Sequence, residues 1–430
     1  MNWKAFFAFI ALVVLFVAGV GLLMFLRRPS ATTFFFTADT QGYLVPCGCK
    51  VIPAGGLARR ATVLDALRKS DGGEPVVPVE VTHGFADRGP GRALLNEEMG
   101  RFFAREGYLV GLGSYDLLLG LPALREAAPG VPLYLAGEPG LAGSKEFRLG
   151  GWGLGPFGNR GARLRVIFLA ETAPGGVSIG DPLKALRAEM AAHPAEGTIV
   201  VGQLAPKTLT SIMEMQPAPL LVVAQWQTDV TSMPQAVGPH WVLYMGDRGR
   251  RSATATVRWT GKEFNVLPTI RYLGPEVASV PSVEREVAQV LDQVAAVNKA
   301  ALAKLSRPAA PGRAYVGSAG CKTCHAEAHK TWSLSSHARA TVDLAIDHQQ
   351  QNPACLQCHA TALGEPGGYP QASVNLAGVG CEACHGPGEG HPGRAMEMQP
   401  AGPQACGACH TPRDSPLFDA AGYWKLIQHK

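Results

Sequence analysis

The sequence carries little net charge and almost no cysteine outside one repeated motif. Its 430 residues have a formal net charge of +5, which is small for this length and argues against a nucleic-acid partner. Four copies of a short motif hold most of the cysteines, so only Cys47 and Cys49 remain outside them. A framework of structural disulfides is therefore excluded, whichever compartment the chain occupies.

The repeated motif is Cys-x-x-Cys-His, and all four copies lie in the last quarter of the chain. The spacing is typical of c-type haem attachment: two thiols bond to the two vinyl groups of the porphyrin, and the adjacent imidazole ligates the iron. The motifs therefore predict four haem c groups. The predicted attachment residues are Cys321, Cys324, Cys355, Cys358, Cys381, Cys384, Cys406 and Cys409, and the predicted proximal iron ligands are His325, His359, His385 and His410.

A pair of zinc sites is the alternative interpretation of these motifs, because two Cys-x-x-Cys pairs can also bind zinc through four thiolates. An all-thiolate site gives no role to a histidine after every cysteine pair. The histidines therefore favour a tetrahaem cytochrome c.

The N-terminus contains one apolar run, Ala5–Leu26, that is long enough to cross a bilayer. At about 1.5 Å per residue the run would form a helix of roughly 33 Å. A cleaved signal peptide is the alternative, but its apolar region is usually shorter, and no Ala-x-Ala-like site precedes Arg27. We therefore predict an N-terminal transmembrane helix that stays attached.

The flanking charges do not decide the orientation of this helix, because Lys4 lies on one side and Arg27 and Arg28 on the other. The haem motifs decide it, since bacterial cytochromes c are assembled outside the cytoplasm. The prediction is a single-pass protein of the inner (cytoplasmic) membrane, with its N-terminus inside and its haem domain periplasmic.

The middle of the chain alternates short apolar runs with amphipathic stretches, which indicates an α/β domain with a largely buried sheet. The predicted strands are Thr33–Thr37, Val76–Val81, Tyr108–Leu112, Leu164–Leu169, Thr198–Leu204, Leu220–Ala224 and Trp241–Tyr244, followed by a hairpin of Thr254–Trp259 and Phe264–Pro268. The predicted helices are Leu57–Leu67, Ala93–Arg105, Pro182–Ala192 and Lys207–Met215.

Residues 32–273 resemble the bacterial 5′-nucleotidases of the calcineurin-like metallophosphoesterase family. The segments that carry the resemblance are Thr37–Tyr43, Gly55–Thr62, Gly107–Leu117, Gly130–Leu133 and Leu243–Gly249. The resemblance implies an α/β sandwich with a two-metal site at its strand ends. Two such metals would clamp a phosphate and activate water.

The residues at the corresponding ligand positions do not suit two metals. Asp39 is the first carboxylate of the family pattern, but Gln41 stands in place of its paired histidine, and Gly84 in place of the bridging carboxylate. The remaining departures are Ser114, Gln203, Gln225 and Gln227. An amide oxygen is a weak, neutral ligand compared with imidazole, and none of the three histidines of this domain is expected to act as a ligand. We predict a domain without phosphoesterase activity; a bifunctional phosphoesterase is the alternative.

Cys47 and Cys49 follow the first segment of this resemblance. They could be a redox-active or metal-holding thiol pair, or a local disulfide or two small buried residues. The sequence leaves both interpretations open.

A long helix is predicted over Val280–Leu305, followed by the Pro-rich segment Arg307–Arg313. The helix could be a spacer or could pack on the haem domain. The predicted division is an anchor over 1–31, the nucleotidase-like domain over 32–273, a helical linker over 274–313 and a small, mainly α-helical haem domain over 314–430.

The haem domain resembles the tetrahaem cytochrome c-554 family, which relays electrons from hydroxylamine oxidation in ammonia oxidisers. The motifs that carry this resemblance are Tyr315–Ser318, Trp332, Ser336-His337, Asn352–Leu356, Gly367–Tyr369, Gly386–His391 and the end from His410 to His429. The resemblance implies that His337, His391 and His429 are distal iron ligands, which leaves the haem of the second motif with an open or weakly held sixth site.

Other residues could serve as ligands. His348 precedes the second motif and is a possible distal ligand. His329 is expected at the surface or at a haem edge, and Met396 and Met398 are expected to pack rather than to ligate.

The sequence therefore predicts a membrane-anchored, extracytoplasmic cytochrome that carries electrons between redox partners. The chain and these partners could be subunits of one membrane redox complex. An oxidoreductase that acts on a small nitrogen or sulfur compound at an open haem is the main alternative.

Overall fold

The computed structural model describes residues 30–47, 53–70, 72–150, 161–226, 233–370, 374–391 and 401–429, with five single residues before Ser30. Most of the predicted anchor Ala5–Leu26, and Cys49, lie outside the described residues. Within the described part, no helix is both long and apolar enough to cross a membrane. The anchor stays a prediction.

The N-terminal region forms two six-stranded mixed sheets. The first has the order β12-β11-β1-β2-β3-β4, and the second β5-β6-β7-β8-β10-β9. The strands of the first sheet are β1 (Ala31–Thr37), β2 (Val76–Glu80), β3 (Leu109–Gly111), β4 (Leu133–Tyr134), β11 (Arg251–Trp259) and β12 (Phe264–Tyr272). Those of the second are β5 (Ser144–Leu149), β6 (Ala162–Ala170), β7 (Gly197–Gln203), β8 (Leu221–Gln225), β9 (Gln235–Val237) and β10 (His240–Met245).

Both sheets have parallel centres. Strands β1 to β4 run parallel, as do β6, β7, β8 and β10, while β11, β12, β5 and β9 pair antiparallel at the edges or beside β1. The carboxyl ends of parallel strands meet at one edge of a sheet, where α/β proteins commonly bind ligands. The loops after these strands are therefore the first place to look for a site.

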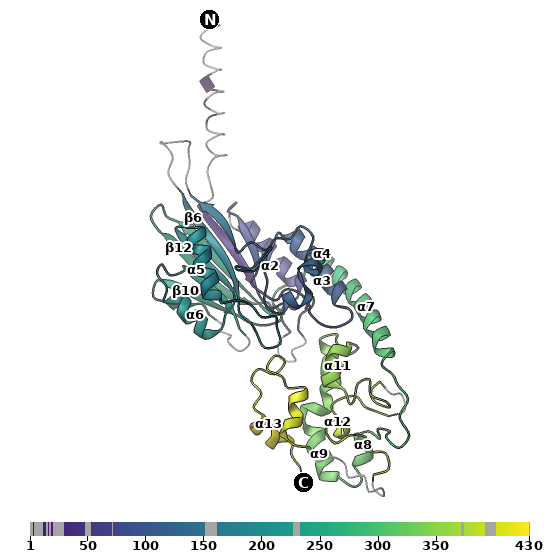
Figure 1. Ribbon diagram of the computed structural model, residues 1–430. Coiled ribbons are helices and arrows are strands. Elements are labelled where there is room, and N and C mark those ends of the chain that lie inside the picture. Colours follow the sequence, from purple (N-terminus) through teal and green to yellow (C-terminus); the bar gives the residue numbers. More distant parts are fainter. Residues whose placement is uncertain are drawn as a thin grey trace.

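Helices cover the outer faces of the two sheets (Figure 1). They are α2 (Leu57–Ser70), α3 (Arg92–Glu106), η1 (Asp116–Leu119), α4 (Leu121–Ala127), α5 (Pro182–Ala192), α6 (Pro206–Met213) and α7 (Pro281–Ala303). One apolar cluster joins α2, α3 and α7 to the first sheet, a second fills the space between the sheets, and a third lies between the second sheet and the α5–α6 layer. The result is a four-layer α/β sandwich.

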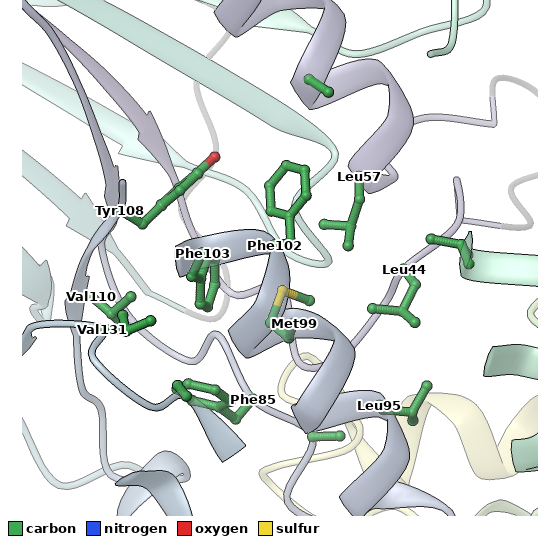
Figure 2. Close-up of a cluster of buried hydrophobic side chains, with 14 of the residues drawn as sticks. Leu44, Leu57, Phe85, Leu95, Met99, Phe102, Phe103, Tyr108, Val110 and Val131 are labelled. Atoms are coloured by element: carbon green, nitrogen blue, oxygen red, sulfur yellow. The ribbon is translucent and has the colours of Figure 1, made fainter. Parts of the chain in front are cut away.

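Strand β1 shows how the sequence builds these layers. Phe34 and Phe36 belong to the cluster between the sheets, whereas Phe35 points to the helical side and joins the cluster shown in Figure 2. Successive strand side chains point to opposite faces, so a run of three phenylalanines can serve two cores at once. This double burial explains why three phenylalanines follow one another in β1.

The structure confirms all nine predicted strands, with end shifts of up to a few residues, and the predicted helices. It adds β4, β5, β9 and α4, which were not predicted. β4 has only two residues and β9 only three. β5 has the sequence Ser-Lys-Glu-Phe-Arg-Leu, which lacks the run of apolar residues that identifies a buried strand. Short or polar edge strands give little hydrophobic signal.

Helix α7 packs on both regions of the chain. Val283, Val287, Val290 and Val294 lie in the cluster with α2 and α3. Leu302, near its C-terminal end, instead packs with Leu344, Leu356 and Ala360 of the C-terminal region. The choice between a spacer and a packed helix, which the sequence left open, is thereby resolved: α7 is packed at both ends.

The C-terminal region consists of short helices and loops. They are α8 (Ser318–Cys321), α9 (Ala326–Leu334), η3 (Ser336–Arg339), α10 (Ala340–Ile346), α11 (Pro353–His359), α12 (Cys381–His385), η4 (Pro403–Ala408) and α13 (Ala420–Ile427). Among the described residues, its apolar cluster has three buried members, Leu344, Leu356 and Ala360, which pack with Leu302 of α7. So small a core suits a region in which bound cofactors supply most of the buried apolar surface.

Candidate haem cavity and strand-end polar site

The second and third motifs lie on short helices that place their residues on successive positions of one turn. Helix α11 begins after Asn352, whose side chain accepts a hydrogen bond from the Ala354 amide at 3.0 Å. This N-cap and Pro353 fix the start of the helix, so that Cys355 and Cys358 lie about one turn apart. The described cysteines are all free thiols, as attachment to a porphyrin requires.

Three of the four motif imidazoles lie opposite a second imidazole. The ring centroids are 6.2 Å apart for His325 and His391, 6.1 Å for His337 and His410, and 5.9 Å for His385 and His429. Imidazole nitrogens bind metals at about 2.0–2.1 Å, so two rings on opposite sides of one iron have centroids about 6 Å apart. The residues present therefore fit a bis-imidazole haem at each of these pairs, and the partners are the three histidines expected on the distal side.

Three of the histidines expected to ligate iron have a hydrogen bond at Nδ1, and that of His410 is to the Ser415 hydroxyl at 3.0 Å. His359 donates from Nδ1 to the Ala340 carbonyl at 2.8 Å, and His429 donates from Nδ1 to the Ile427 carbonyl at 3.0 Å. A backbone acceptor at Nδ1 places the proton there and leaves the Nε2 lone pair for a metal.

His359 of the second motif differs from the other three. No imidazole of the described residues faces its ring. His348 lines a separate hollow with Leu44, Leu291 and Asp292, and does not line the cavity that contains His359. The geometry therefore does not support the suggestion that His348 is a distal ligand.

His329 packs edge-on against Trp332, with ring centroids 5.2 Å apart. Met396 and Met398 lie outside the described residues.

A cavity of about 1150 Å³ joins the two regions. The motif residues that line it are Cys355, Cys358, His359, Cys384, His385, Cys406, Cys409 and His410, together with His337 and His429. From the N-terminal region it is lined by Asp39, Gln41, Tyr43, His83, Gln203 and Gln225, among others. The space expected for haem therefore opens directly onto the strand ends of the α/β sandwich.

The attachment thiols are grouped in space. The Cys321 thiol lies close to that of Cys381, and the Cys358 thiol close to that of Cys409. The first motif thus adjoins the third, and the second adjoins the fourth.

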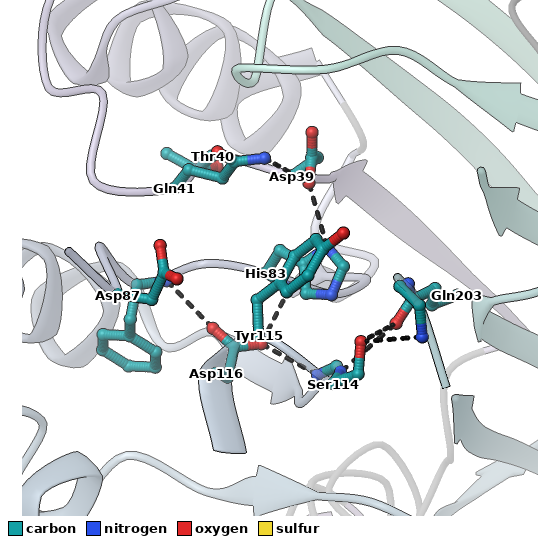
Figure 3. A network of polar contacts seen from close by, with 12 residues as sticks. Asp39, Thr40, Gln41, His83, Asp87, Ser114, Tyr115, Asp116 and Gln203 are labelled. Carbon is teal, nitrogen blue, oxygen red and sulfur yellow. Dashed lines mark hydrogen bonds and ion pairs between the residues drawn. The ribbon is translucent and has the colours of Figure 1, made fainter. Parts of the chain in front are cut away.

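The polar residues at the strand ends form a connected site (Figure 3). Asp39 and Gln41 follow β1, and His83 follows β2. Asp39 Oδ1 lies 3.0 Å from Nδ1 of His83 and accepts a hydrogen bond from Gln41 Nε2 at 2.9 Å. All three residues have left-handed backbones, with φ values of 54°, 49° and 51°. Strained backbone of this kind concentrates at functional sites, which suggests that the loops keep an inherited geometry.

The second half of the site joins the two sheets. Ser114 follows β3, and both its amide and its hydroxyl donate to Oε1 of Gln203 at 3.2 Å. Gln203 ends β7, and Gln225 ends the neighbouring β8. Two pairs of residues at the expected ligand positions are therefore hydrogen-bonded to each other, Asp39 with Gln41 and Ser114 with Gln203, and Gln227 lies outside the described residues.

Buried charges hold these loops in place. Glu80, at the end of β2, pairs with Arg60 of α2 at 3.3 Å and accepts hydrogen bonds from the hydroxyls of Thr37 and Thr40. Neither charged side chain is exposed. This network fixes the loop that carries Asp39.

Two pKa shifts reflect the burial of the site. Burial raises the pKa of Asp116 to about 6, although the charge of His83 and backbone amides, including that of Gly113, oppose the rise. Burial opposes protonation of His83, but the hydrogen bond and charge of Asp39 outweigh it and raise the pKa of the imidazole. Sequence reasoning gave His83 no role as a ligand and missed its contact with Asp39; the position of His83 directly after a buried strand was the available signal.

Comparison with known proteins begins with the C-terminal region. Residues 320–386 match the family described as cytochrome c554 and c-prime. A stretch of 92 residues is 34% identical to cytochrome c-554 of Nitrosomonas europaea, and covers 17% of this chain and 39% of the relative. The C-terminal region resembles the cytochrome c554 family. The chain spans well under half the length of this curated relative, and the segment matched by the family contains three of the four motifs.

The N-terminal region has the fold of the 5′-nucleotidase and metallophosphoesterase group. It matches a Thermus thermophilus sulfate thiohydrolase SoxB structure with a TM-score of 0.50 and 12% identity, over 62% of this chain and 61% of that chain. A 5′-nucleotidase precursor, also from Thermus thermophilus, gives a TM-score of 0.47 and 18% identity, over 67% and 62% of the two chains. At such identities the likeness concerns the fold alone.

The cytochrome c554-like region thus faces the strand ends of the nucleotidase-like domain. Among the described residues, no group of three or more His, Cys, Asp or Glu side chains is arranged to hold a metal ion. The absence of phosphoesterase activity stays a prediction.

Proposed function

We propose that this chain is an extracytoplasmic, membrane-anchored cytochrome that carries electrons through four covalently attached haems. The single observation that supports this most strongly is the opposed placement of three imidazole pairs at 5.9–6.2 Å. An apolar packing role would not place three motif histidines, from separate parts of the chain, at the same centroid distance from a second imidazole. Iron ligation would.

The proposed ligand sets follow from these pairs. His325 and His391 would hold the first haem, and His337 and His410 the fourth. The third would lie between His385 and His429. When bound, the haems supply one-electron redox chemistry. Ligation by two imidazoles, without a thioether, favours a lower reduction potential than His–Met ligation.

The contacts between thiols suggest the route of the electrons. Cys321 adjoins Cys381, and Cys358 adjoins Cys409, so the attachment sites fall into two neighbouring couples. The chain holds each couple close enough for exchange between its two members. We propose that electrons move within these couples and between them through the shared cavity.

The second candidate function is oxidoreductase chemistry on a small nitrogen or sulfur compound. His359 has no facing imidazole among the described residues, and it lines the large cavity. His359 would hold the second haem from one side only, which leaves the opposite side for an exchangeable ligand. A ferric protein with one high-spin haem that binds an added ligand would support this function.

The nucleotidase-like domain is proposed to be a non-hydrolytic scaffold. Its carboxylate at Asp39 is already engaged by Gln41 and His83, and its amides at Gln203 and Gln225 are poor substitutes for imidazole. The alternative of a second, phosphoesterase activity would require a metal pair in this site. We propose redox proteins of the same membrane, with which the anchor could assemble, as the partners.

The experiment that tests the proposed function is quantification of haem together with its spin state. Pyridine haemochrome analysis of the purified full-length chain should give four haems for each polypeptide. The ferric protein should contain three low-spin haems and one high-spin haem by electron paramagnetic resonance. A value of about three haems or fewer would refute the proposal, because the four motifs predict four.

A further inference from the structure

The two regions of the chain meet through oppositely arranged ion pairs. Asp87 of the nucleotidase-like domain pairs with Arg413, and the adjacent Arg88 pairs with Asp414 at 2.9 Å. The Arg413 guanidinium also lies over the Tyr115 ring, 4.0 Å from its centroid. An Asp-Arg dipeptide therefore faces an Arg-Asp dipeptide, and such a pairing fixes one relative placement of the two surfaces.

A third ion pair lies across the same interface. Arg248 bonds Asp347 at 3.1 Å and lies over the Tyr43 ring at 5.0 Å. Close by, Gly89 has a left-handed φ of 92°, and a Cβ at this position would lie 2.8 Å from Nδ2 of Asn352. The backbone of one region thus closely approaches the N-cap of helix α11 in the other.

We call the six charged residues of these pairs the interdomain clamp: Asp87, Arg88, Arg248, Asp347, Arg413 and Asp414.

The interdomain clamp lies beside the second motif. The charges of Arg88 and Arg248 both act on Cys355, and that of Arg88 also acts on Cys358. Both arginines line the cavity together with His359. The wall of the cavity near the second motif is therefore contributed by the nucleotidase-like domain and not by the cytochrome region alone.

The charge of the lining restricts what the cavity can accept. Eight carboxylates and three arginines line it. Each of these arginines is paired with a carboxylate of the interdomain clamp. Among the described lining residues, every guanidinium is therefore already paired with a carboxylate. An anion that enters the cavity would be repelled by the excess of negative charge, which opposes its binding.

We propose that the nucleotidase-like domain forms the distal wall of a ligand site at the second haem, that this site accepts small uncharged molecules and rejects anions, and that the interdomain clamp controls entry. The proposal rests on the open second haem of the proposed function. In this proposal the strand-end face of the nucleotidase-like domain needs no metal. It encloses the ligand site of the second haem and determines which small molecules can enter.

The test uses the full-length, haem-loaded ferric protein and two probes, imidazole at about pH 8.5, where it is uncharged, and azide. Binding is followed by the loss of the high-spin signal. Asp87→Arg places a third positive charge beside Arg88 and Arg413, and the repulsion between them should separate the two regions at this interface. The rate of imidazole binding should then increase at least about tenfold. Asp87→Arg combined with Arg413→Asp restores an ion pair and should return the rate to within about twofold of wild type.

Glu126→Arg is the matched control, because it reverses an exposed charge on α4 of the same domain and does not line the cavity. It should leave the imidazole rate unchanged. Arg413→Gln is a milder variant for the case that Asp87→Arg does not fold, and it should accelerate imidazole binding in the same direction. The azide affinity of wild type should rise about threefold with added salt, because salt screens repulsion by the lining.

The outcomes separate this proposal from the one on which it rests. A ferric protein without a high-spin haem would overturn both. A high-spin haem whose imidazole rate is the same in wild type, Asp87→Arg and Arg413→Gln would overturn the proposed wall and leave the open haem intact. An azide affinity that falls with salt would show that the cavity attracts anions, and would overturn the proposed selectivity.

Discussion

Removal of one distal imidazole should convert one low-spin haem to a high-spin haem. His391 is the best target, because the plane of its ring is within 18° of that of His325 and the two ring centroids are 6.2 Å apart. The structure offers three such pairs and one unpaired motif histidine among the described residues, His359. Wild type should therefore contain low-spin and high-spin haems in a ratio of about three to one.

In His391→Ala the ratio should become about two to two, so that the low-spin signal falls by about a third and the high-spin signal doubles. Spin quantification of the ferric protein by electron paramagnetic resonance measures both changes. Haem content should stay at the wild-type level, because the thioether bonds and His325 remain. His329→Ala is the control: this ring contacts Trp332 and faces no motif imidazole, so its removal should leave the ratio unchanged. A wild-type ratio in His391→Ala, at full haem content, would refute the ligand assignment.

The remaining predictions concern the scaffold and the anchor. Arg60→Ala should leave Glu80 buried without its partner and lower the free energy of unfolding by about 3–5 kcal/mol, measured by urea denaturation; a loss under about 1 kcal/mol would contradict the proposed network. Replacement of residues 1–28 by a cleavable secretion signal should release a soluble, haem-loaded protein; continued membrane association would point to a partner embedded in the membrane. The full-length chain should bind no pair of manganese or zinc ions and should not hydrolyse nucleotides or bis-phosphoesters; two bound metals with turnover would overturn the proposed scaffold role.

Much of the fold could be predicted from the sequence because the central strands of both sheets are buried on two faces. Such strands contain several consecutive apolar residues, as Phe34–Phe36 of β1 and Leu221–Ala224 of β8 show, and these runs predict the positions of the strands. The strands that were missed lie at edges, where β5 and β9 are polar or short. Their pairing depends on neighbours that no local pattern reveals.

The proposed haem attachment residues can be named from the sequence alone, because the bond-forming groups of each motif are close together in the chain. The distal histidines could be expected only through the family resemblance, since His391 and His325 are separated by more than sixty residues. The arrangement of the two regions could not be predicted. Asp87 and Arg413 are 326 positions apart, and a single charged pair leaves no periodic signal in the sequence. The contact of His83 with Asp39, and the opening of the haem cavity onto the strand ends, also join residues that are far apart in the sequence. They could not be predicted for the same reason.

The central claim is that one chain carries four covalent haems. Intact mass spectrometry of the denatured, purified protein tests it most directly, because thioether bonds survive unfolding whereas ligated but unattached haem is lost. The account predicts a single main species whose mass exceeds that of the polypeptide by four haems. A main species with three haems or fewer, from cells that mature other multihaem cytochromes completely, would contradict it.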